Sequence, residues 1–323
     1  MKRLIVLLGV MAVSLSPVFV RLSTAPSMVL VLYRVAFATL ILTPYVLLRC
    51  RAELRGMKRR ELLLCMCSGI FLGLHFSAYF ESLQHTSIAV AAVLVNTEAI
   101  FVTLGSVAFL KSRLQGKAWA AVLITFAGSV IVALADLSGG GSLKGNLLAL
   151  VGAIMGAAYT LVGTVCRRGG ISTTMYTYFL YMAAALTVLV LSLFSGLSLT
   201  GYEPVNLLTT LGMAVFCTLM GHSVYSWGLK YLPASFIATA KLVEPVFAAV
   251  WGLILFRERP ALLVVAGGSF GHRFCEICEV YGIPHTAIEL RQGHALTYAD
   301  LAPYAGQGYT GLLVNMHETS TGV

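Results

Sequence analysis

A series of long apolar runs constrains this chain more than any other feature, because each run is close to the length that crosses a membrane. The runs lie at roughly 4 to 22, 28 to 48, 62 to 82, 86 to 110, 117 to 135, 145 to 165, 173 to 194, 206 to 228 and 233 to 256. About 20 apolar helical residues cross a hydrocarbon core of roughly 30 Å. The first run also fits a signal peptide, but the apolar pattern resumes at Met28 and favours a retained span. The sequence therefore predicts an all-α polytopic membrane protein with nine clear spans.

The charge composition agrees with this class. Charged residues make up 11% of the chain and hydrophobic residues 58%, whereas an ordinary soluble domain is about 25% charged. The net charge of +9 comes mostly from lysines and arginines in the short gaps between the apolar runs. That placement orients a membrane protein and argues against nucleic acid as a partner.

The distribution of lysine and arginine over alternate gaps predicts the orientation. With the N-terminus in the cytoplasm, 14 of these residues fall in cytoplasmic gaps and 4 in outer gaps. The richest gap runs from Arg49 to Arg60. We therefore expect a multi-pass protein of the plasma membrane, the inner membrane of a bacterium, with a cytoplasmic N-terminus.

An internal repeat is visible at a constant offset of 146 residues. The matching pairs are Ser77 with Ser223, Tyr79 with Tyr225, Leu83 with Leu229, Glu98 with Glu244, Phe101 with Phe247, Lys111 with Arg257 and Arg113 with Arg259. Because one offset contains five predicted crossings, an odd number, the second copy is expected to be inverted in the membrane. Transporters often carry such repeats, with the substrate site at the repeat interface.

Charged residues inside the apolar runs are the first candidates for a substrate or coupling site. Lys241 and Glu244 are three residues apart in the ninth run, so a continuous helix would let them pair. Glu98 has no lysine one turn before it, and we expect an unpartnered carboxylate that exchanges protons, with Asn96 sharing the proton. A purely structural pair that fixes helix packing is the alternative for Lys241 and Glu244.

Aromatic and histidine side chains in the spans are further candidates. They are Tyr79, Tyr225 and Trp227, which would line a substrate cavity, and His75 and His222, which lie one residue out of register in the repeat. Packing or interface anchoring is the alternative for the aromatic residues, and a hydrogen-bonded interior position is favoured for the histidines. Arg34 lies near the outer end of the second span, and we expect it to snorkel to the interface or cap a neighbouring helix.

Three segments resemble a known family. They are YRVAFATLIL in the second span, NTEAIFVTLGSVAFLKSRL in the fourth and LVEPVFAAVWGLILFRERP in the ninth, and they are similar to the EamA branch of the drug/metabolite transporter superfamily. The resemblance covers about residues 1 to 265. It implies ten helices in two inverted five-helix repeats, a central cavity and export of small metabolites such as amino acids. The first half departs from the pattern, because Ala99 stands where a proline is usual and Ser112 where an acidic residue is usual.

The tail after Arg259 departs from that family. Its apolar part, PALLVVAGGSF, would form only about 16 Å of helix, which makes a truncated tenth span. The following residues predict a helix near 271 to 281 and strands near 285 to 290 and 311 to 315. From about 261 to 323 the tail also resembles a class V pyridoxal-phosphate aminotransferase. This resemblance implies a strand and a turn before a helix at LLVVAGGSFGHRF, and its HETSTG motif implies a hydroxyl of Thr319, Ser320 or Thr321 beside the cofactor. The tail contains no lysine, however, so it cannot form the Schiff base that this chemistry requires.

The sequence therefore divides into a first EamA-like repeat at 1–137, a second and incomplete one at 138–265, and a short α/β-like, aminotransferase-like fragment at 266–323. The leading prediction is a transporter, and more narrowly an exporter, of small organic metabolites that works by alternating access. The alternatives are a membrane-anchored aminotransferase-related protein and a non-functional fusion of two fragments. We expect no enzyme activity, no cofactor and no metal site. The predicted partners are a small-molecule substrate and the lipid bilayer, with a homodimer left open.

Overall fold

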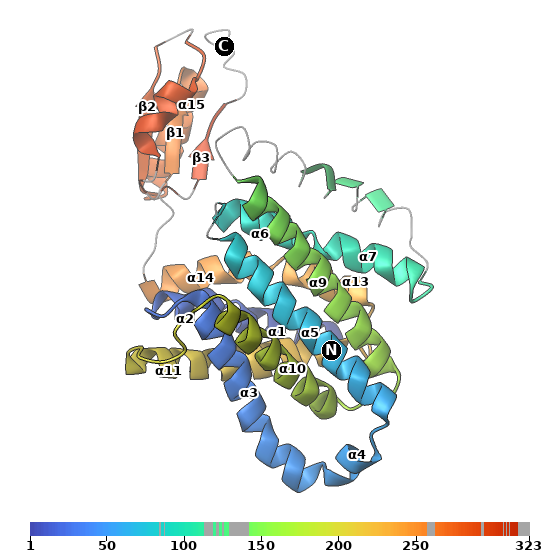
Figure 1. Cartoon of the computed structure of the whole chain (residues 1–323). Helices are drawn as coiled ribbons and strands as arrows, with labels where there is room; N and C mark the ends of the chain where they lie inside the picture. The colour runs from blue at the N-terminus through green and yellow to red at the C-terminus, as the bar shows by residue number, and fades with distance from the viewer. Residues whose placement is uncertain are drawn as a thin grey trace. The chain divides into compact units, whose positions relative to one another are not determined.

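The structure is a computed structural model, and it falls into two compact units, Met1–Trp251 and Gly252–Val323. It describes residues 1–83, 85–86, 88–112, 119–120, 123–124, 126–128, 142–256, 262–291, 294–305, 307, 309 and 311–315. The first unit is helical, and the second carries a small β-sheet (Figure 1).

The helical unit is built from long helices and several shorter ones. Its first half contains α1 (Lys2–Val13), α2 (Ser16–Arg21), α3 (Ser27–Arg49), α4 (Arg51–Gly56), α5 (Arg59–Ser82), α6 (Ile88–Asn96) and α7 (Glu98–Ala108). Its second half contains α9 (Leu143–Arg168), α10 (Thr173–Phe194), α11 (Pro204–Gly212), the π-helix η1 (Met213–His222), α12 (Ser223–Gly228), α13 (Ala234–Lys241) and α14 (Glu244–Phe256).

Seven helical segments among the described residues are long and apolar enough to cross a membrane. They are Lys2–Arg21, Ser27–Arg49, Arg59–Ser82, Leu143–Arg168, Thr173–Phe194, Pro204–Gly228 and Ala234–Phe256, and each coincides with a predicted span. Of the predicted span at 117 to 135, the structure describes only residues 119–120, 123–124 and 126–128. The chain is thus a mostly helical protein with several apolar spans, as the sequence predicts.

Two predicted spans are broken near their middle, where the sequence predicts continuous helices. The run at 86 to 110 is divided into α6 and α7 at Thr97, and the run at 233 to 256 is divided into α13 and α14. At the first break, the Thr97 hydroxyl donates to the Leu94 carbonyl at 2.6 Å, and the Thr97 amide bonds the same carbonyl at 3.2 Å. These three-residue steps tighten the backbone and end the regular α-helical ladder. Both second halves begin at a glutamate, Glu98 or Glu244.

The core of the helical unit lies where α5 packs against α9 and α10. Large side chains fill it, and the fully buried ones include Tyr176, Tyr181 and Leu180. Gly69 lets α5 and α10 approach closely, since a Cβ there would collide with the Leu180 carbonyl oxygen. Such small residues promote helix packing in membranes, where burial of apolar surface drives little association.

The second unit contains a parallel three-stranded sheet with strand order β2-β1-β3. Its elements after α14 are β1 (Leu262–Ala266), α15 (Ser269–Val280), β2 (His285–Glu289), α16 (Tyr298–Leu301), the short helix η2 (Ala302–Tyr304) and β3 (Gly311–Leu313). The truncated tenth helix predicted from PALLVVAGGSF is wrong, because its described residues 262–266 form strand β1. The physical reason is that LLVVA pairs with strands on both sides, and parallel strands of this kind are continuous apolar runs. The helix and strands predicted farther along correspond to α15, β2 and β3.

Candidate functional site

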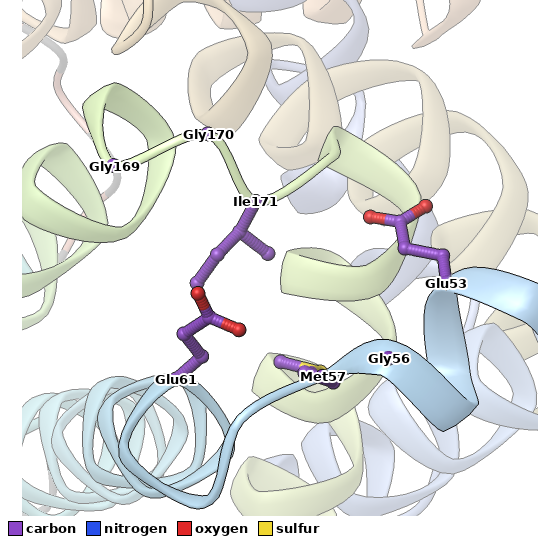
Figure 2. A pocket seen from close by; sticks show the side chains of 7 residues that line it. All are labelled: Glu53, Gly56, Met57, Glu61, Gly169, Gly170 and Ile171. Carbon is purple, nitrogen blue, oxygen red and sulfur yellow. The ribbon is translucent and has the colours of Figure 1, made fainter.

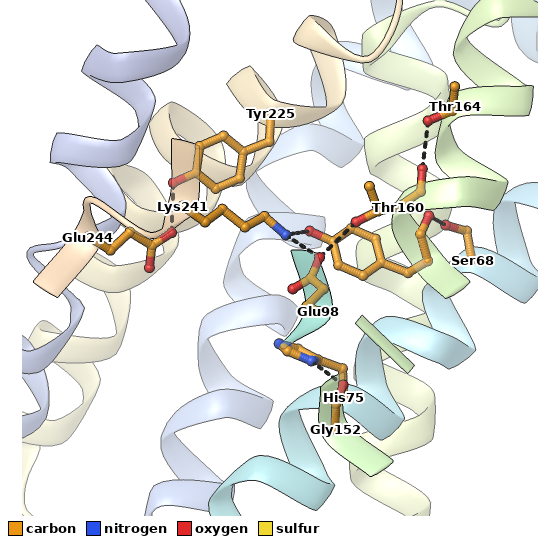
Figure 3. Close-up of polar contacts among 10 residues, drawn as sticks. Ser68, His75, Glu98, Gly152, Thr160, Thr164, Tyr225, Lys241 and Glu244 are labelled. Carbon is orange, nitrogen blue, oxygen red and sulfur yellow. Dashed lines mark hydrogen bonds and ion pairs between the residues drawn. The ribbon is translucent and has the colours of Figure 1, made fainter. Parts of the chain in front are cut away.

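A buried ion pair lies between the two broken helices. Lys241 is the last residue of α13 and Glu98 the first of α7, and their Nζ and Oε1 atoms are 2.8 Å apart (Figure 3). The side chains are only 12% and 9% exposed. At this degree of burial, each charge depends on the other for its stability. The pair therefore joins a helix of the first half of the chain to a helix of the second.

Helix α9 supplies further polar groups to this pair. The Lys241 ammonium donates to the Tyr159 hydroxyl at 2.9 Å and lies 4.9 Å from the centre of that ring. The Thr160 hydroxyl donates to Glu98 Oε1 at 3.1 Å. The position of Glu98 at the N-terminus of α7 adds a favourable interaction with the helix dipole. Sequence reasoning missed Tyr159 and Thr160, because neither carries a charge that would mark it in an apolar run.

The predicted pairing of Lys241 with Glu244 is wrong. It assumed a continuous helix, but the break at residues 242 and 243 removes the one-turn spacing, and the ammonium bonds Glu98 instead. The prediction that Glu98 lacks a partner is wrong for the same reason. Glu244 accepts a hydrogen bond from the Tyr225 hydroxyl at 2.8 Å (Figure 3).

The two predicted histidines lie inside the bundle, close to these groups. His75 Nδ1 donates to the Gly152 carbonyl at 2.8 Å, since a carbonyl can only accept. Its ring lies 6.3 Å from that of Tyr159. The His222 ring lies 5.8 Å from Phe76 and 5.5 Å from Tyr225, in edge-on contacts. His75 thus adjoins the ion pair, and His222 adjoins the residue that bonds Glu244.

The remaining predicted residues take no part in these hydrogen bonds, within the part of the chain that the structure describes. Trp227 packs against Tyr231 with ring centres 4.9 Å apart, and Tyr79 packs against Phe80 at 5.5 Å. Asn96 is half-buried at the end of α6, and its side chain makes no hydrogen bond to Glu98. A proton shared between these two residues is therefore not supported by their contacts.

Arg34 is not an interfacial residue, contrary to the prediction. It lies in α3, is only 3% exposed, and donates from Nε to the Thr218 hydroxyl at 2.7 Å. Its guanidinium carbon lies 5.2 Å from the centre of the Phe76 ring. The long apolar run around Arg34 gives no indication of which face of the helix is buried, so its position could not be predicted from the sequence.

A separate pocket opens at the turns after α4 and α9 (Figure 2). Its volume is about 290 Å³, and its lining residues are Glu53, Gly56, Met57, Glu61, Gly169, Gly170 and Ile171. Glu53 accepts a hydrogen bond from the Ser172 amide at 3.1 Å, and Glu61 accepts one from the Lys58 amide at 2.9 Å. Both carboxylates thus hold the ends of helices, which favours a structural role for this pocket.

Comparisons with known proteins point to transport. The sequence profile of the EamA-like transporter family matches residues 2–134 and 143–271. An uncharacterized transporter of Clostridium kluyveri is 26% identical over 64% of this chain and 68% of its own length. The pseudopaline exporter CntI of Pseudomonas aeruginosa is 25% identical over 76% of this chain and 84% of its own length. A solved crystal structure superposes with a TM-score of 0.61 and 18% identity, covering 87% of this chain and 95% of that one.

Proposed function

This chain belongs to the EamA-like transporter family, and on that premise we propose that it exports small organic metabolites, amino acids among them, by alternating access. Two relatives are described as transporters, one of them as an exporter of pseudopaline. The proposed transport involves no covalent chemistry. We further propose that it lies in the plasma membrane with a cytoplasmic N-terminus.

The observation that carries this proposal is the buried pair of Lys241 and Glu98. Each residue lies at the break of an interrupted helix, and broken helices are typical of transporter binding sites. A pair that bridges the two halves closes the bundle at that depth while it is intact. Replacing this contact with substrate contacts is the kind of exchange that alternating access needs.

The positions of the helix breaks support the proposed division into repeats at 1–137 and 138–265. Helices α7 and α14 begin at Glu98 and Glu244, directly after the two breaks. These two starts are 146 residues apart, which equals the offset in the sequence. The profile of the family also matches the chain in two successive segments.

Proton coupling through Glu244 is a narrower part of the proposal. Among the described residues, Glu244 Oε1 accepts a hydrogen bond from the neutral Tyr225 hydroxyl and interacts with Lys241 and Arg34 only at longer range, whereas Glu98 bonds Lys241 directly. An ionised carboxylate is costly at membrane depth unless a positive charge compensates it. Glu244 is therefore better suited than Glu98 to gain and lose a proton during transport.

Liposomes that contain the purified protein and a mixture of amino acids test this proposal. Under an imposed pH gradient, efflux measured by mass spectrometry is expected to depend on the gradient. Glu244→Gln is expected to abolish that dependence, because an amide cannot titrate. The matched control is Glu81→Gln, which changes a carboxylate whose side chain is 51% exposed.

The results separate the two parts of the proposal. An unchanged gradient-dependent efflux in Glu244→Gln would reject the coupling role of Glu244. Efflux of no amino acid from wild-type liposomes would reject amino acids as substrates, and the same assay with a cell extract would then test other small metabolites.

The second unit bears on the two alternative functions, a membrane-anchored aminotransferase-related protein and a non-functional fusion. Its parallel sheet and following helix are compatible with a fragment of an α/β enzyme, as the aminotransferase resemblance implies. Residues 272–323 lie beyond the family match. We propose that the tail is a fragment of such an enzyme. It is not expected to catalyse pyridoxal chemistry, because residues 261–323 contain no lysine to form the Schiff base.

A further inference from the structure

Arg34 is a buried positive charge whose bonding is incomplete. Its Nε atom donates to the Thr218 hydroxyl, and its guanidinium lies over the Phe76 ring. Its Nη2 atom is enclosed by protein and has no hydrogen-bond partner among the described residues. A guanidinium stays charged in proteins, and a buried polar group without a partner is strongly unfavourable. A group that binds only part of the time would account for this arrangement.

The nearby carboxylates already have other partners. Glu98 is bonded to Lys241 and Thr160, and Glu244 is bonded to Tyr225. No ion pair joins Arg34 to a carboxylate within the described part of the chain. Among the described residues, Arg34 interacts with the Glu244 carboxylate at longer range but forms no direct ion pair with it, so the guanidinium can bind an anion that comes from outside the protein.

The surroundings of Arg34 limit what that anion can be. Phe76 contacts both the guanidinium and the ring of His222, and His222 in turn contacts Tyr225. A row of rings thus extends from Arg34 to the tyrosine that bonds Glu244. Once opened by a movement of η1, this row would suit an organic molecule with an apolar body, a negative group at the Arg34 end and a polar or cationic group at the Glu244 end.

The helix that covers Arg34 is itself irregular. Thr218 and His222 belong to η1, a π-helix of 10 residues. The Thr218 hydroxyl accepts from Arg34 and also donates to the Met213 carbonyl, five residues earlier, at 3.2 Å. Long π-helical turns are rare, and those that occur are frequently at functional sites. Arg34 is therefore held by the one described span whose backbone departs from the α-helical ladder in this way.

From these observations we propose that Arg34 binds the carboxylate of the transported molecule. The proposal rests on the proposed transport function and narrows its substrates to small organic carboxylates. The planar guanidinium matches a carboxylate in shape and charge. Since Nη2 is enclosed here, the carboxylate reaches it when η1 moves away from α3 during the transport cycle.

Binding of L-phenylalanine and L-leucine, each compared with its own amide, tests the proposal on the purified full-length chain. At pH 6, well below the pKa of about 7.7 to 8.0 of such an amino group, the amide keeps the body and the ammonium group and lacks only the negative charge. A hydrogen bond to a charged group contributes enough binding free energy that the wild type should bind each acid at least about tenfold more tightly than its amide. Arg34→Gln should lower this preference to near one by weakening acid binding, while Arg34→Lys should keep part of it.

Two controls make the result specific. Arg55→Gln removes an exposed arginine of α4 and should leave the preference for the acid unchanged. Inorganic phosphate is added as a competitor, and it should displace phenylalanine poorly. The comparison of acid and amide in the wild type and in Arg34→Lys still decides the question if Arg34→Gln fails to fold.

Several results would overturn the proposal. They are equal binding of acid and amide by the wild type, binding of neither, an equal loss of both in Arg34→Gln, and displacement by phosphate at concentrations similar to those of the amino acid. A protein that transports a neutral or cationic metabolite in the liposome assay would reject the carboxylate site and leave the transport function standing. Absence of any transport would instead reject the function itself.

Discussion

At the scale of single residues, the pair of Lys241 and Glu98 explains why a membrane-spanning segment retains two charges. Their 2.8 Å contact is nearly closed to solvent, and Tyr159 and Thr160 satisfy further hydrogen-bonding positions. In such a setting, the removal of one partner leaves the other charge buried and uncompensated. When both charges are removed together, no buried and uncompensated charge remains.

This reasoning predicts strong coupling between the two positions. Lys241→Met or Glu98→Gln alone is expected to lower the free energy of unfolding by about 3 to 5 kcal/mol, as for other buried pairs that lose one partner. The double variant should lose less than the sum of the two single variants. Unfolding of the detergent-solubilised protein, followed by tryptophan fluorescence in denaturant, measures the three differences. Lys230→Met, at an exposed lysine, is the control, and additive losses in the double variant would contradict the prediction.

At the scale of elements, Gly156 of α9 allows this helix to pack closely against the functional site. A Cβ on Gly156 would lie 2.8 Å from His75 Nδ1 and 2.9 Å from Glu98 Oε2. These distances are shorter than normal contacts, so the glycine allows α5 and α7 to bring their polar groups against α9. One turn earlier on α9, a Cβ on Gly152 would meet its nearest neighbour, the Tyr79 amide nitrogen, at 3.4 Å, which is an ordinary contact.

Alanine substitutions at these two glycines therefore have different expected effects. Gly156→Ala should lower the melting temperature and reduce efflux from liposomes, because the new methyl group displaces His75 or Glu98. Gly152→Ala should leave both nearly unchanged or raise the melting temperature, since alanine favours helix by roughly 1 kcal/mol over glycine. The measurements are thermal unfolding and the amino-acid efflux assay on both variants. Equal effects of the two substitutions would show that the contact at Gly156 does not matter.

The elements also show which parts of the structure could be predicted from the sequence. Seven apolar runs agree with long helices, because a hydrophobic length of about 20 residues is a local property. The candidate residues Glu98, Lys241 and Glu244 were found from their charge, but their partners were predicted wrongly. Partner choice depends on the helix break after Lys241 and on the packing of α7 against α13, and neither is visible in the pattern of apolar residues.

At the scale of the whole molecule, the described residues cover the ninth span much less than they cover the other six spans. Only 12% of its apolar window is buried within the described part of the chain, whereas the other six spans are 33% to 50% buried. In the family that the sequence resembles, a tenth helix follows this span. Here the chain continues into strand β1. A tenth helix would offer apolar side chains to the exposed ones of α14, which include Val246, Leu253 and Ile254.

Replacement of residues 262–323 by an apolar helix of about 20 residues is therefore expected to stabilise the protein. The reason is that the new helix can pack against the ninth span, and in membranes van der Waals contacts of this kind drive association. Thermal unfolding in detergent should shift to higher temperature, and efflux from liposomes should become faster. The matched control ends at residue 261 and should show neither gain. If the original chain is already as stable and as active as the replaced one, the tail does not stand in for a missing helix, and the interpretation as a non-functional fusion is rejected.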